Sequence, residues 1–455
     1  MSSNIDSIQS TIDQWATHEK EWALKYLIQF QQNMKNSDEL TLDHHHDIKH
    51  ISQSNNNRED SESIITQKRS EQELSESIET FPVYDRKNPF SARVLKKERI
   101  TGDASNKEVY HLELSLQGSG LTYQPGDILG IHHDNPPRLV QAILTHFKID
   151  ADAPFFYRDH LRIAESILHH LVEITSINAM LLKKYQKLTD HEGLQKLLQN
   201  KDEKLAYLHG HDILDLLHDF PSDITFDQFI TILTPRYPRL YSIASSMKKV
   251  DQQVHITIRT VRYEIKNRER EGACSTFIAD RIKERQLLPI FIESNKGFKL
   301  PNQPQHPIVM IGAGVGVAPF RSFLQEIDQL ESSKKPESWL FFGEQKRESD
   351  YLYQSEWKAF QNKKTLGRID TAFSRDKEQK VYVQHRITEQ QSLLWEWIEH
   401  KNAHLYICGD KNHMAKEVQE SLKEIVRKHG NLTTEEADKY IKTLKREKRL
   451  QLDVF

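Results

Sequence analysis

An apolar strand turns sharply into a helix in the stretch IVMIGAGVGVAPF, residues 308–320. Four apolar residues precede Gly312, Gly314 and Gly316, and Pro319 falls where a first helical turn begins. Glycines let the backbone approach a ligand closely, and a helix N-terminus favours a pyrophosphate. The stretch is therefore a candidate nucleotide site. It also suits a purely structural strand-to-helix turn, and both interpretations stay open.

Strand and helix patterns alternate strictly from residue 306 onward. The patterns predict strands at 308–311, 339–342, 368–373 and 404–408, and helices at 319–330, 350–361, 386–400 and 411–429. Strict alternation is typical of a parallel, doubly wound sheet, whose ligands bind at the carboxyl ends of the strands. We expect residues 301–455 to form such a domain.

The sequence upstream predicts a β domain that is split by helices. Short strand-like stretches with turn residues occupy 81–134, and strand patterns return over 233–300. Residues 135–232 are mostly helical in pattern and contain little glycine. We expect a helical insert over 135–232 between two halves of one β domain.

Composition excludes several classes of protein. The 455 residues carry 63 Lys and Arg against 66 Asp and Glu, whereas a dedicated nucleic-acid binder usually has a basic excess. No apolar run is long enough for a membrane helix, and the charged first twenty residues do not resemble a signal peptide. Two cysteines, Cys274 and Cys408, form neither a disulfide framework nor a structural zinc site. We expect a cytoplasmic protein without a metal site.

The net charge is distributed unevenly. Residues 1–80 carry 15 acidic and 7 basic side chains, which leaves a basic excess for the remainder. Apolar residues at helical spacing predict a helix over 8–30. Its two tryptophans suit docking either on a partner or on the chain's own body. Residues 31–80 have the composition of a disordered linker, and the histidine run at 44–46 reads as solvated.

Two further motifs suit parts of a nucleotide. Ser374 and Arg375 follow the third strand of the alternating region, with Lys380 and Tyr382 close behind. A hydroxyl, a guanidinium and an ammonium together suit a phosphate monoester such as the 2′-phosphate of NADPH. In RLYSIASS, residues 239–246, an aromatic ring stands beside a cation and hydroxyls, which suits a flat ring joined to a pyrophosphate.

Taken in order, these motifs resemble the ferredoxin–NADP reductase-type module of the diflavin reductase family. The matching stretches are 239–246, 272–275, 312–320, 374–375, 380–384, 408–410 and 453–455, supported by 123–127, 261–263 and 350–354. The resemblance runs from about residue 83 to Phe455 and is closest to members that serve assimilatory sulfite reduction. It implies an antiparallel FAD-binding β-barrel with a helical insertion, followed by a doubly wound NADP-binding domain.

The resemblance implies two sets of cofactor contacts. Tyr241 would stack on the flavin and Arg239 would hold the FAD pyrophosphate. The full FAD set is Thr175, Arg239, Leu240, Tyr241, Ser242, Thr257, Tyr263, Gly272, Ala273, Cys274, Ser275 and Phe455. The NADPH set is Gly312, Gly314, Gly316, Ser374, Arg375, Lys380, Val381, Tyr382, Val383, Gln384 and Glu417, the last in place of the family's aspartate.

The implied reaction is hydride transfer from NADPH to FAD, in which the redox chemistry belongs to the cofactors. Ser242, Cys408 and Asp453 correspond to the family's polar trio around the transfer site. Phe455 corresponds to the aromatic residue that covers the flavin and must move before nicotinamide can stack there.

Three departures from the family matter. Phe455 replaces a tyrosine or tryptophan, and Ala313 and Val315 replace proline and threonine in the glycine turn. Residues 1–80 are too few for the usual FMN-binding flavodoxin-like domain, which needs about 150 residues. We therefore expect a separate electron acceptor, either a flavodoxin-like carrier or a sulfite reductase hemoprotein. A general NADPH-hemoprotein, flavodoxin or ferredoxin reductase and a non-catalytic subunit are the alternatives, and the oligomeric state stays open.

Overall fold

The computed structural model describes residues 82–301 and 306–455. The predicted helix at 8–30, the predicted linker at 31–80 and the histidine run at 44–46 lie outside these residues. The described residues belong to one compact unit, which begins at Thr80. Among the described helices, none has both the length and the apolar character needed to cross a membrane.

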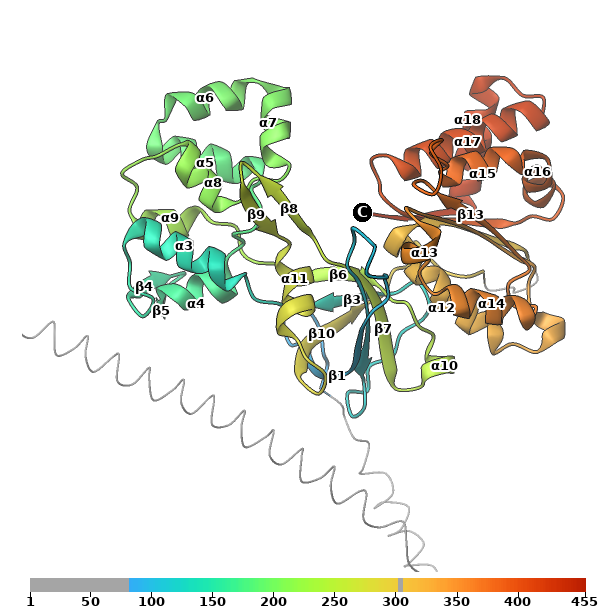
Figure 1. Ribbon diagram of the computed structural model, residues 1–455, viewed down its shortest axis with the longest axis horizontal. Coiled ribbons are helices and arrows are strands. Elements are labelled where there is room, and N and C mark those ends of the chain that lie inside the picture. Colours follow the sequence, from blue (N-terminus) through green and yellow to red (C-terminus); the bar gives the residue numbers. More distant parts are fainter. Residues whose placement is uncertain (1–81, 302–305) are drawn as a thin grey trace, which may run out of the picture. The chain divides into compact units, whose positions relative to one another are not determined.

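Strands between residues 90 and 293 build an antiparallel barrel (Figure 1). Within the described chain they lie in the order β6-β3-β10-β1-β2-β7, and a bridge between Ile243 and Ile256 joins the two ends of this order. Inward side chains such as Leu112 and Leu129 form one apolar core. The bounds are β1 Phe90–Arg99, β2 Val109–Ser115, β3 Ile128–Ile131, β6 Arg239–Ser242, β7 Gln253–Arg259 and β10 Leu287–Glu293.

Helices fill the chain between β3 and β6, as the sequence pattern predicted. They share an apolar core that includes Tyr185, Leu216 and Phe229. The structure adds a small hairpin that the pattern did not indicate, β4 Pro154–Tyr157 with β5 His160–Ile163. The helices are α3 Pro137–Phe147, α4 Ala164–Ser166, the π-helix η1 Ile167–Leu171, α5 Ala179–Thr189, α6 Glu192–Gln199, α7 Lys201–Leu208, α8 Ile213–Asp219 and α9 Phe226–Ile232.

A second hairpin connects the barrel to its following helix. Strands β8 (Arg262–Ile265) and β9 (Arg268–Glu271) are joined by Lys266 and Asn267, whose φ angles are 51° and 57°. Two left-handed residues in a two-residue loop are typical of a tight hairpin turn. The short helices that complete this part are α10 Met247–Val250, α11 Ala273–Thr276 and the π-helix η2 Phe277–Arg281.

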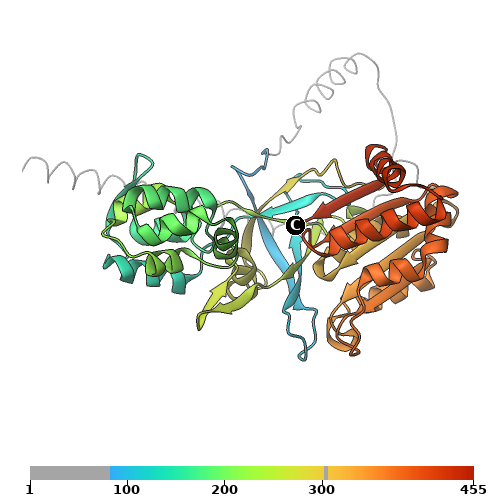
Figure 2. The same ribbon diagram turned by 90° about the horizontal axis from the view of Figure 1, so that it is seen from above.

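The described residues after 305 contain a parallel sheet with the strand order β13-β12-β11-β14-β15. Four of its strands were predicted, and the fifth, β15, was not. Figure 2 shows β15, in red, ending at the C-terminus. The strands are β11 Ile308–Ala313, β12 Ser338–Glu344, β13 Arg368–Phe373, β14 His404–Gly409 and β15 Leu450–Val454. The helices are η3 Gly314–Val317, α12 Ala318–Asp328, η4 Ser332–Lys334, α13 Arg347–Asp350, α14 Gln354–Asn362, α15 Val383–Glu389, α16 Gln391–Glu399, α17 Met414–His429 and α18 Thr434–Arg446.

Both faces of this parallel sheet are buried. Val309 and Ile311 pack with residues of α15 to α18 on one face, whereas Ile308 and Met310 pack with α12 and α14 on the other (Figure 1). Alternate residues of one strand thus serve two separate cores, which explains why these strands read as continuous apolar runs. The predicted fold class, an antiparallel barrel followed by a doubly wound parallel sheet, is confirmed.

Candidate functional site

Polar and glycine-rich segments gather at the carboxyl edge of the parallel sheet. The glycine turn follows β11, Ser374 and Arg375 follow β13, and Asp410 follows β14. Because the strands are parallel, these segments leave the sheet at one edge, where ligands of doubly wound sheets bind. The candidate site is therefore centred on this edge.

The predicted polar trio meets around one carboxylate. Ser242 Oγ, at the end of β6, donates a hydrogen bond to Asp453 Oδ2 at 2.6 Å. Cys408 Sγ lies 3.8 Å from the same oxygen, because Cys408 and Asp453 are register partners in β14 and β15. Burial, and then the neighbouring Asp453, hold the pKa of the Cys408 thiol well above its usual value. The thiol therefore stays protonated at neutral pH.

The terminal aromatic residue, Phe455, lies two positions after Asp453. The backbone N–H of Phe455 donates to Gly409 O at 3.2 Å, and Phe455 O accepts from Lys411 N at 3.0 Å. Its side chain is 64% exposed. Backbone contacts thus hold Phe455 at the end of β14 while the residue remains largely exposed.

The glycine turn packs against the end of β14. Gly314 has φ +58°, a left-handed conformation that L side chains rarely adopt. A Cβ on Gly316 would lie 2.2 Å from the carbonyl oxygen of Cys408, so only glycine fits there. Gly316 therefore brings the turn close to the backbone of Cys408, a member of the polar trio.

The predicted phosphate-binding residues surround the ends of β12 and β13. Ser374 N donates to Glu344 O at 2.9 Å and Arg375 N to Gln345 O at 2.8 Å, which fixes the backbone of both residues. The Arg375 and Lys380 side chains are exposed, and Tyr382 is 43% exposed. Ser374 and Arg375 directly follow β13, and Lys380 and Tyr382 come later in the same connection to α15, so this connection offers two cations and two hydroxyls that suit a phosphate monoester.

The remaining predicted NADPH residues divide into two groups. Gln384 Nε2 donates to the carboxylate of Glu417, so the structure brings these two side chains together. Val383 is buried in the sheet core, and only its backbone remains for a ligand. Val381 packs partly buried against the same core.

Replacing Arg375 tests the phosphate site. We expect Arg375→Ala to lower kcat/KM for NADPH about ten- to hundredfold, because a charge-assisted hydrogen bond to phosphate is lost. kcat/KM for NADH, which lacks this phosphate, should change little. Lys401→Ala is the control, since Lys401 pairs with Glu337 at 3.0 Å before β14 and β12, at the opposite edge of the sheet. An unchanged NADPH to NADH ratio in the Arg375 variant would remove this residue from the site.

Strand β6, which carries the predicted flavin contacts, is tied to the helical insert by a carboxylate that sequence reasoning missed. Glu173 is buried, and its carboxylate accepts from Arg239 Nη2 at 2.9 Å. It also accepts from Thr175 N at 2.9 Å and from Thr175 Oγ1 at 2.6 Å. The structure thereby brings two predicted FAD contacts, Thr175 and Arg239, together through Glu173. No local pattern in the sequence marks Glu173, which lies 66 positions from Arg239.

Glu173 should matter for FAD affinity. We expect Glu173→Gln to raise the Kd for FAD about three- to tenfold, because Arg239 loses its charged anchor and must be ordered on binding. Fluorescence titration of the FAD-free chain measures this, with the exposed Glu165→Gln as the control. Tighter FAD binding would instead show that Glu173 competes with the cofactor for Arg239.

The loop at 272–275 is closed by its own hydrogen bonds. Gly272 N donates to Val261 O at 2.9 Å, and Ser275 Oγ accepts from Val261 N at 3.1 Å. Ala273 and Cys274 are buried, and burial raises the pKa of the Cys274 thiol to about 12, with Tyr241 beside it. Burial likewise raises the pKa of Tyr241. Leu240, between Arg239 and Tyr241, is exposed.

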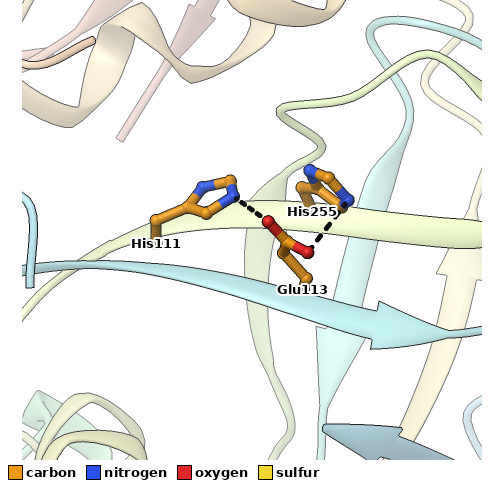
Figure 3. A group of neighbouring side chains, drawn as sticks. All are labelled: His111, Glu113 and His255. Carbon is orange, nitrogen blue, oxygen red and sulfur yellow. Dashed lines mark hydrogen bonds and ion pairs between the residues drawn. The ribbon is translucent and has the colours of Figure 1, made fainter. Parts of the chain in front are cut away.

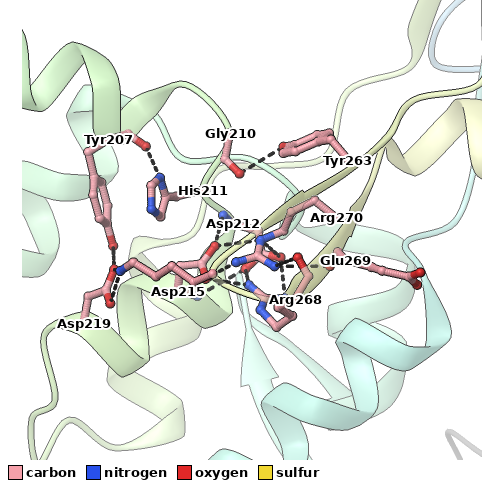
Figure 4. Close-up of polar contacts among 11 residues, drawn as sticks. Tyr207, Gly210, His211, Asp212, Asp215, Asp219, Tyr263, Arg268, Glu269 and Arg270 are labelled. Carbon is pink, nitrogen blue, oxygen red and sulfur yellow. Dashed lines mark hydrogen bonds and ion pairs between the residues drawn. The ribbon is translucent and has the colours of Figure 1, made fainter. Parts of the chain in front are cut away.

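Four charged residues clamp the β8–β9 hairpin onto the helical insert (Figure 4). Arg268 donates to both oxygens of Asp212, and Arg270 donates to both oxygens of Asp215. Asp212 also caps α8, where Asp215 closes the capping box. Because β9 continues directly into the 272–275 loop, this charged clamp fixes the entry to the predicted pyrophosphate site.

Two predicted FAD residues make other contacts. Tyr263 donates from its hydroxyl to Gly210 O at 3.0 Å and is partly exposed (Figure 4). Thr257 is buried, and its hydroxyl lies 2.7 Å from the Tyr353 hydroxyl. Their roles toward FAD, like those of the other predicted cofactor contacts, stay predictions.

Family models match both halves of the described chain. A model described as "FAD binding domain" matches residues 82–191 and 162–277, and one described as "Oxidoreductase NAD-binding domain" matches residues 310–420. Fold and site together thus define a ferredoxin–NADP reductase-like module with FAD-binding and NAD(P)-binding domains. The predicted cofactors, FAD and NADPH, agree with these two domains.

Curated relatives carry the name "Sulfite reductase [NADPH] flavoprotein alpha-component". The chain is 43% identical to the one from Bacillus subtilis over 378 residues, which is 82% of this chain and 62% of the relative. It is 42% identical to that of Serratia proteamaculans over 373 residues, with 82% and 62% covered. The Zymomonas mobilis relative is 40% identical over 372 residues, with 82% and 61% covered. The chain is homologous to these flavoproteins and spans about 60% of their length.

Proposed function

We propose that this chain is an NADPH-dependent FAD flavoprotein reductase that works in the cytoplasm and delivers electrons to a separate acceptor in sulfite reduction. When bound, FAD supplies the redox chemistry, because it can accept a hydride from NADPH and release electrons to an acceptor. The chain's own residues bind and orient the two cofactors, and Ser242, Cys408 and Asp453 supply the polar groups at the transfer site.

The observation that carries this proposal is the meeting of Ser242 and Cys408 at Asp453. Ser242 ends the strand that bears Tyr241, whereas Cys408 and Asp453 end neighbouring strands of the nucleotide-binding sheet. The Asp453 carboxylate therefore orients the Ser242 hydroxyl and the protonated Cys408 thiol. This contact lies where the end of β6 meets the carboxyl edge of the parallel sheet. Such fixed dipoles can hold a nicotinamide and stabilise charge that develops during transfer.

The proposal also concerns the identity of the electron acceptor. The names of the relatives support a role in sulfite reduction. A flavodoxin-like carrier or a sulfite reductase hemoprotein would then take the electrons.

An acceptor panel tests this assignment. The purified chain is loaded with FAD and given NADPH together with ferricyanide, a flavodoxin, a ferredoxin or a sulfite reductase hemoprotein. We expect turnover with ferricyanide and faster turnover with the flavodoxin or the hemoprotein than with the ferredoxin. Turnover with ferredoxin alone among the protein acceptors would contradict the link to sulfite.

A further inference from the structure

Four polar side chains, His111, Glu113, His255 and Thr257, share the outer face of barrel strands β2 and β7, and Figure 3 shows the first three. His111 is the register partner of Thr257, and Glu113 is the register partner of His255. The residues that alternate with them enter the barrel core. His111, His255 and Thr257 are nearly fully buried, so other parts of the chain must cover this face.

Tyr353 and Arg321, from the nucleotide-binding part of the chain, provide this cover. The Tyr353 hydroxyl lies 2.9 Å from His111 Nδ1 and 2.7 Å from Thr257 Oγ1. The Arg321 guanidinium stacks over the Tyr353 ring, with its carbon 4.9 Å from the ring centroid. Tyr353 itself has φ 57° and ψ 26°, a left-handed conformation that is uncommon for a bulky residue. Its surroundings therefore hold it in place.

The contacts of this polar cluster determine which nitrogen of each histidine donates and which accepts. Arg321 Nη1 lies 3.4 Å from His255 Nδ1, and a guanidinium can only donate, so this nitrogen accepts. His111 Nε2 lies 3.2 Å from Glu113 Oε1 and donates to the carboxylate, which leaves His111 Nδ1 to accept from Tyr353. Burial, and then Arg321, lower the pKa of His111 to about 2. The same causes lower the pKa of His255 to about 3, so both rings are neutral at pH 7.

Helix α12, which carries Arg321, also binds the segment that follows strand β6. Arg321 Nη1 donates to Ala244 O at 2.7 Å, and Gln325 Oε1 accepts from Ser246 N at 3.0 Å. Both side chains lie on α12, which begins directly after the glycine turn. Only Ile243 separates residues 244–246 from Ser242, the last residue of β6. One helix therefore connects the glycine turn to the backbone that follows strand β6.

We propose that Arg321 and Tyr353 are positioning residues for hydride transfer, which fix the nucleotide-binding edge against strand β6 through the polar cluster on β2 and β7. This inference rests on the proposed function. Neither residue needs to touch a cofactor. Their effect is on the distance and orientation between the two cofactor sites, to which transfer rates are sensitive.

A metal site is the competing interpretation of the same residues. His111, Glu113 and His255 each offer a ligand atom, and these atoms lie within 4.8 Å of one another (Figure 3). The Arg321 contact disfavours a cation, because it places a positive charge beside His255. It also requires His255 Nδ1 to accept, which leaves the proton of the neutral ring on Nε2, the atom that faces Glu113.

Tyr353→Phe tests the proposal by removing a single hydroxyl. FAD-loaded chain is mixed with NADPH in a stopped-flow instrument, which gives the limiting rate of flavin reduction and the apparent Kd for NADPH. We expect the limiting rate to fall about ten- to hundredfold, with Kd changed less than about twofold. Tyr185→Phe is the matched control, since Tyr185 is a buried tyrosine whose hydroxyl donates to Phe220 O at 2.9 Å within the helical insert. Its limiting rate should equal that of the wild type.

The outcomes separate this inference from the proposed function. If NADPH does not reduce the flavin of the wild type, both fail. If it does, and Tyr353→Phe reacts at the wild-type rate, only the positioning role fails. Equal rate losses in both tyrosine variants would also overturn it, since they would reflect general stability. Should Tyr353→Phe not fold, Arg321→Lys, which keeps the charge but loses the fork, must show the same loss of rate. A loss of rate after treatment of the wild type with EDTA, restored by Zn²⁺, would assign the cluster to a metal instead.

Discussion

We expect Asp453→Ala to lower the limiting rate of flavin reduction by NADPH about a hundredfold, while FAD stays bound. The reason is that one carboxylate orients both the Ser242 hydroxyl, at 2.6 Å, and the Cys408 thiol, at 3.8 Å. Without Asp453 neither group has a fixed direction. Stopped-flow absorbance of the FAD-loaded variant measures the rate, and the absorbance spectrum measures the retained FAD.

Two single substitutions divide this loss of rate between the two contacts of Asp453. Ser242→Ala and Cys408→Ala each remove one of the two contacts to Asp453, so each should cost about tenfold. Asp438→Ala is the control, because Asp438 pairs with Lys423 on α17 and α18, away from the strand ends. A limiting rate for Asp453→Ala within about threefold of the wild type would show that the trio does not serve the transfer.

Arg270→Met should destabilise the folded chain by about 1.5–3 kcal/mol, because a buried carboxylate loses two charged hydrogen bonds and keeps only Arg268 as its ionic partner. Arg270 is 2% exposed and Asp215 is 7% exposed, so water cannot replace the lost contacts. Urea unfolding monitored by circular dichroism gives the change. FAD should also dissociate more readily, since β9 leads into the 272–275 loop.

Two further variants define the cause of that loss. Arg262→Met, on the same hairpin, breaks the exposed pair with Asp280 and should cost about 0–1 kcal/mol. Combining Arg270→Met with Asp215→Leu should recover much of the stability, since an apolar pair can replace a buried ion pair. No recovery in the double variant would mean that the other contacts of Asp215, its capping-box bond and its pair with Arg268, matter more than its pair with Arg270.

The charged clamp also predicts a dependence on pH. Burial raises the pKa of Asp215, but hydrogen bonds from Arg268, the Asp212 backbone and Arg270 outweigh it, so the net pKa is lowered. A lowered pKa in the folded state stabilises the fold above the unfolded value, which is about 3.9. This contribution is lost as pH falls through the folded pKa. The stability difference between wild type and Arg270→Met should therefore shrink under acid.

The sequence predicted the parts of the fold that follow from local pattern. Strands β11 and β12 are buried on both faces, and their apolar runs and following helices indicated a parallel sheet directly. Strand β15 escaped this reasoning because Gln451 and Asp453 interrupt its apolar character. It exists as a strand because it pairs with β14, a contact between distant residues that no local pattern records.

The residues of the candidate site were likewise predictable where a local pattern or the family resemblance marked them. Ser374 and Arg375 were found because they follow a predicted strand, and the resemblance to a known family supplied Asp453. Glu173, Arg321 and Tyr353 were given no role, because each makes a key contact with a residue 66 or more positions away. Their importance depends on how the barrel strands and the helices pack, which spacing along the chain does not show.

An anaerobic titration of the FAD-loaded chain with NADPH tests the central claim most directly. We expect about one equivalent of NADPH to bleach the absorbance of the oxidised flavin, and NADH to do so only at much higher concentration. A chain that retains no FAD, or a bound flavin whose spectrum excess NADPH leaves unchanged, would contradict it.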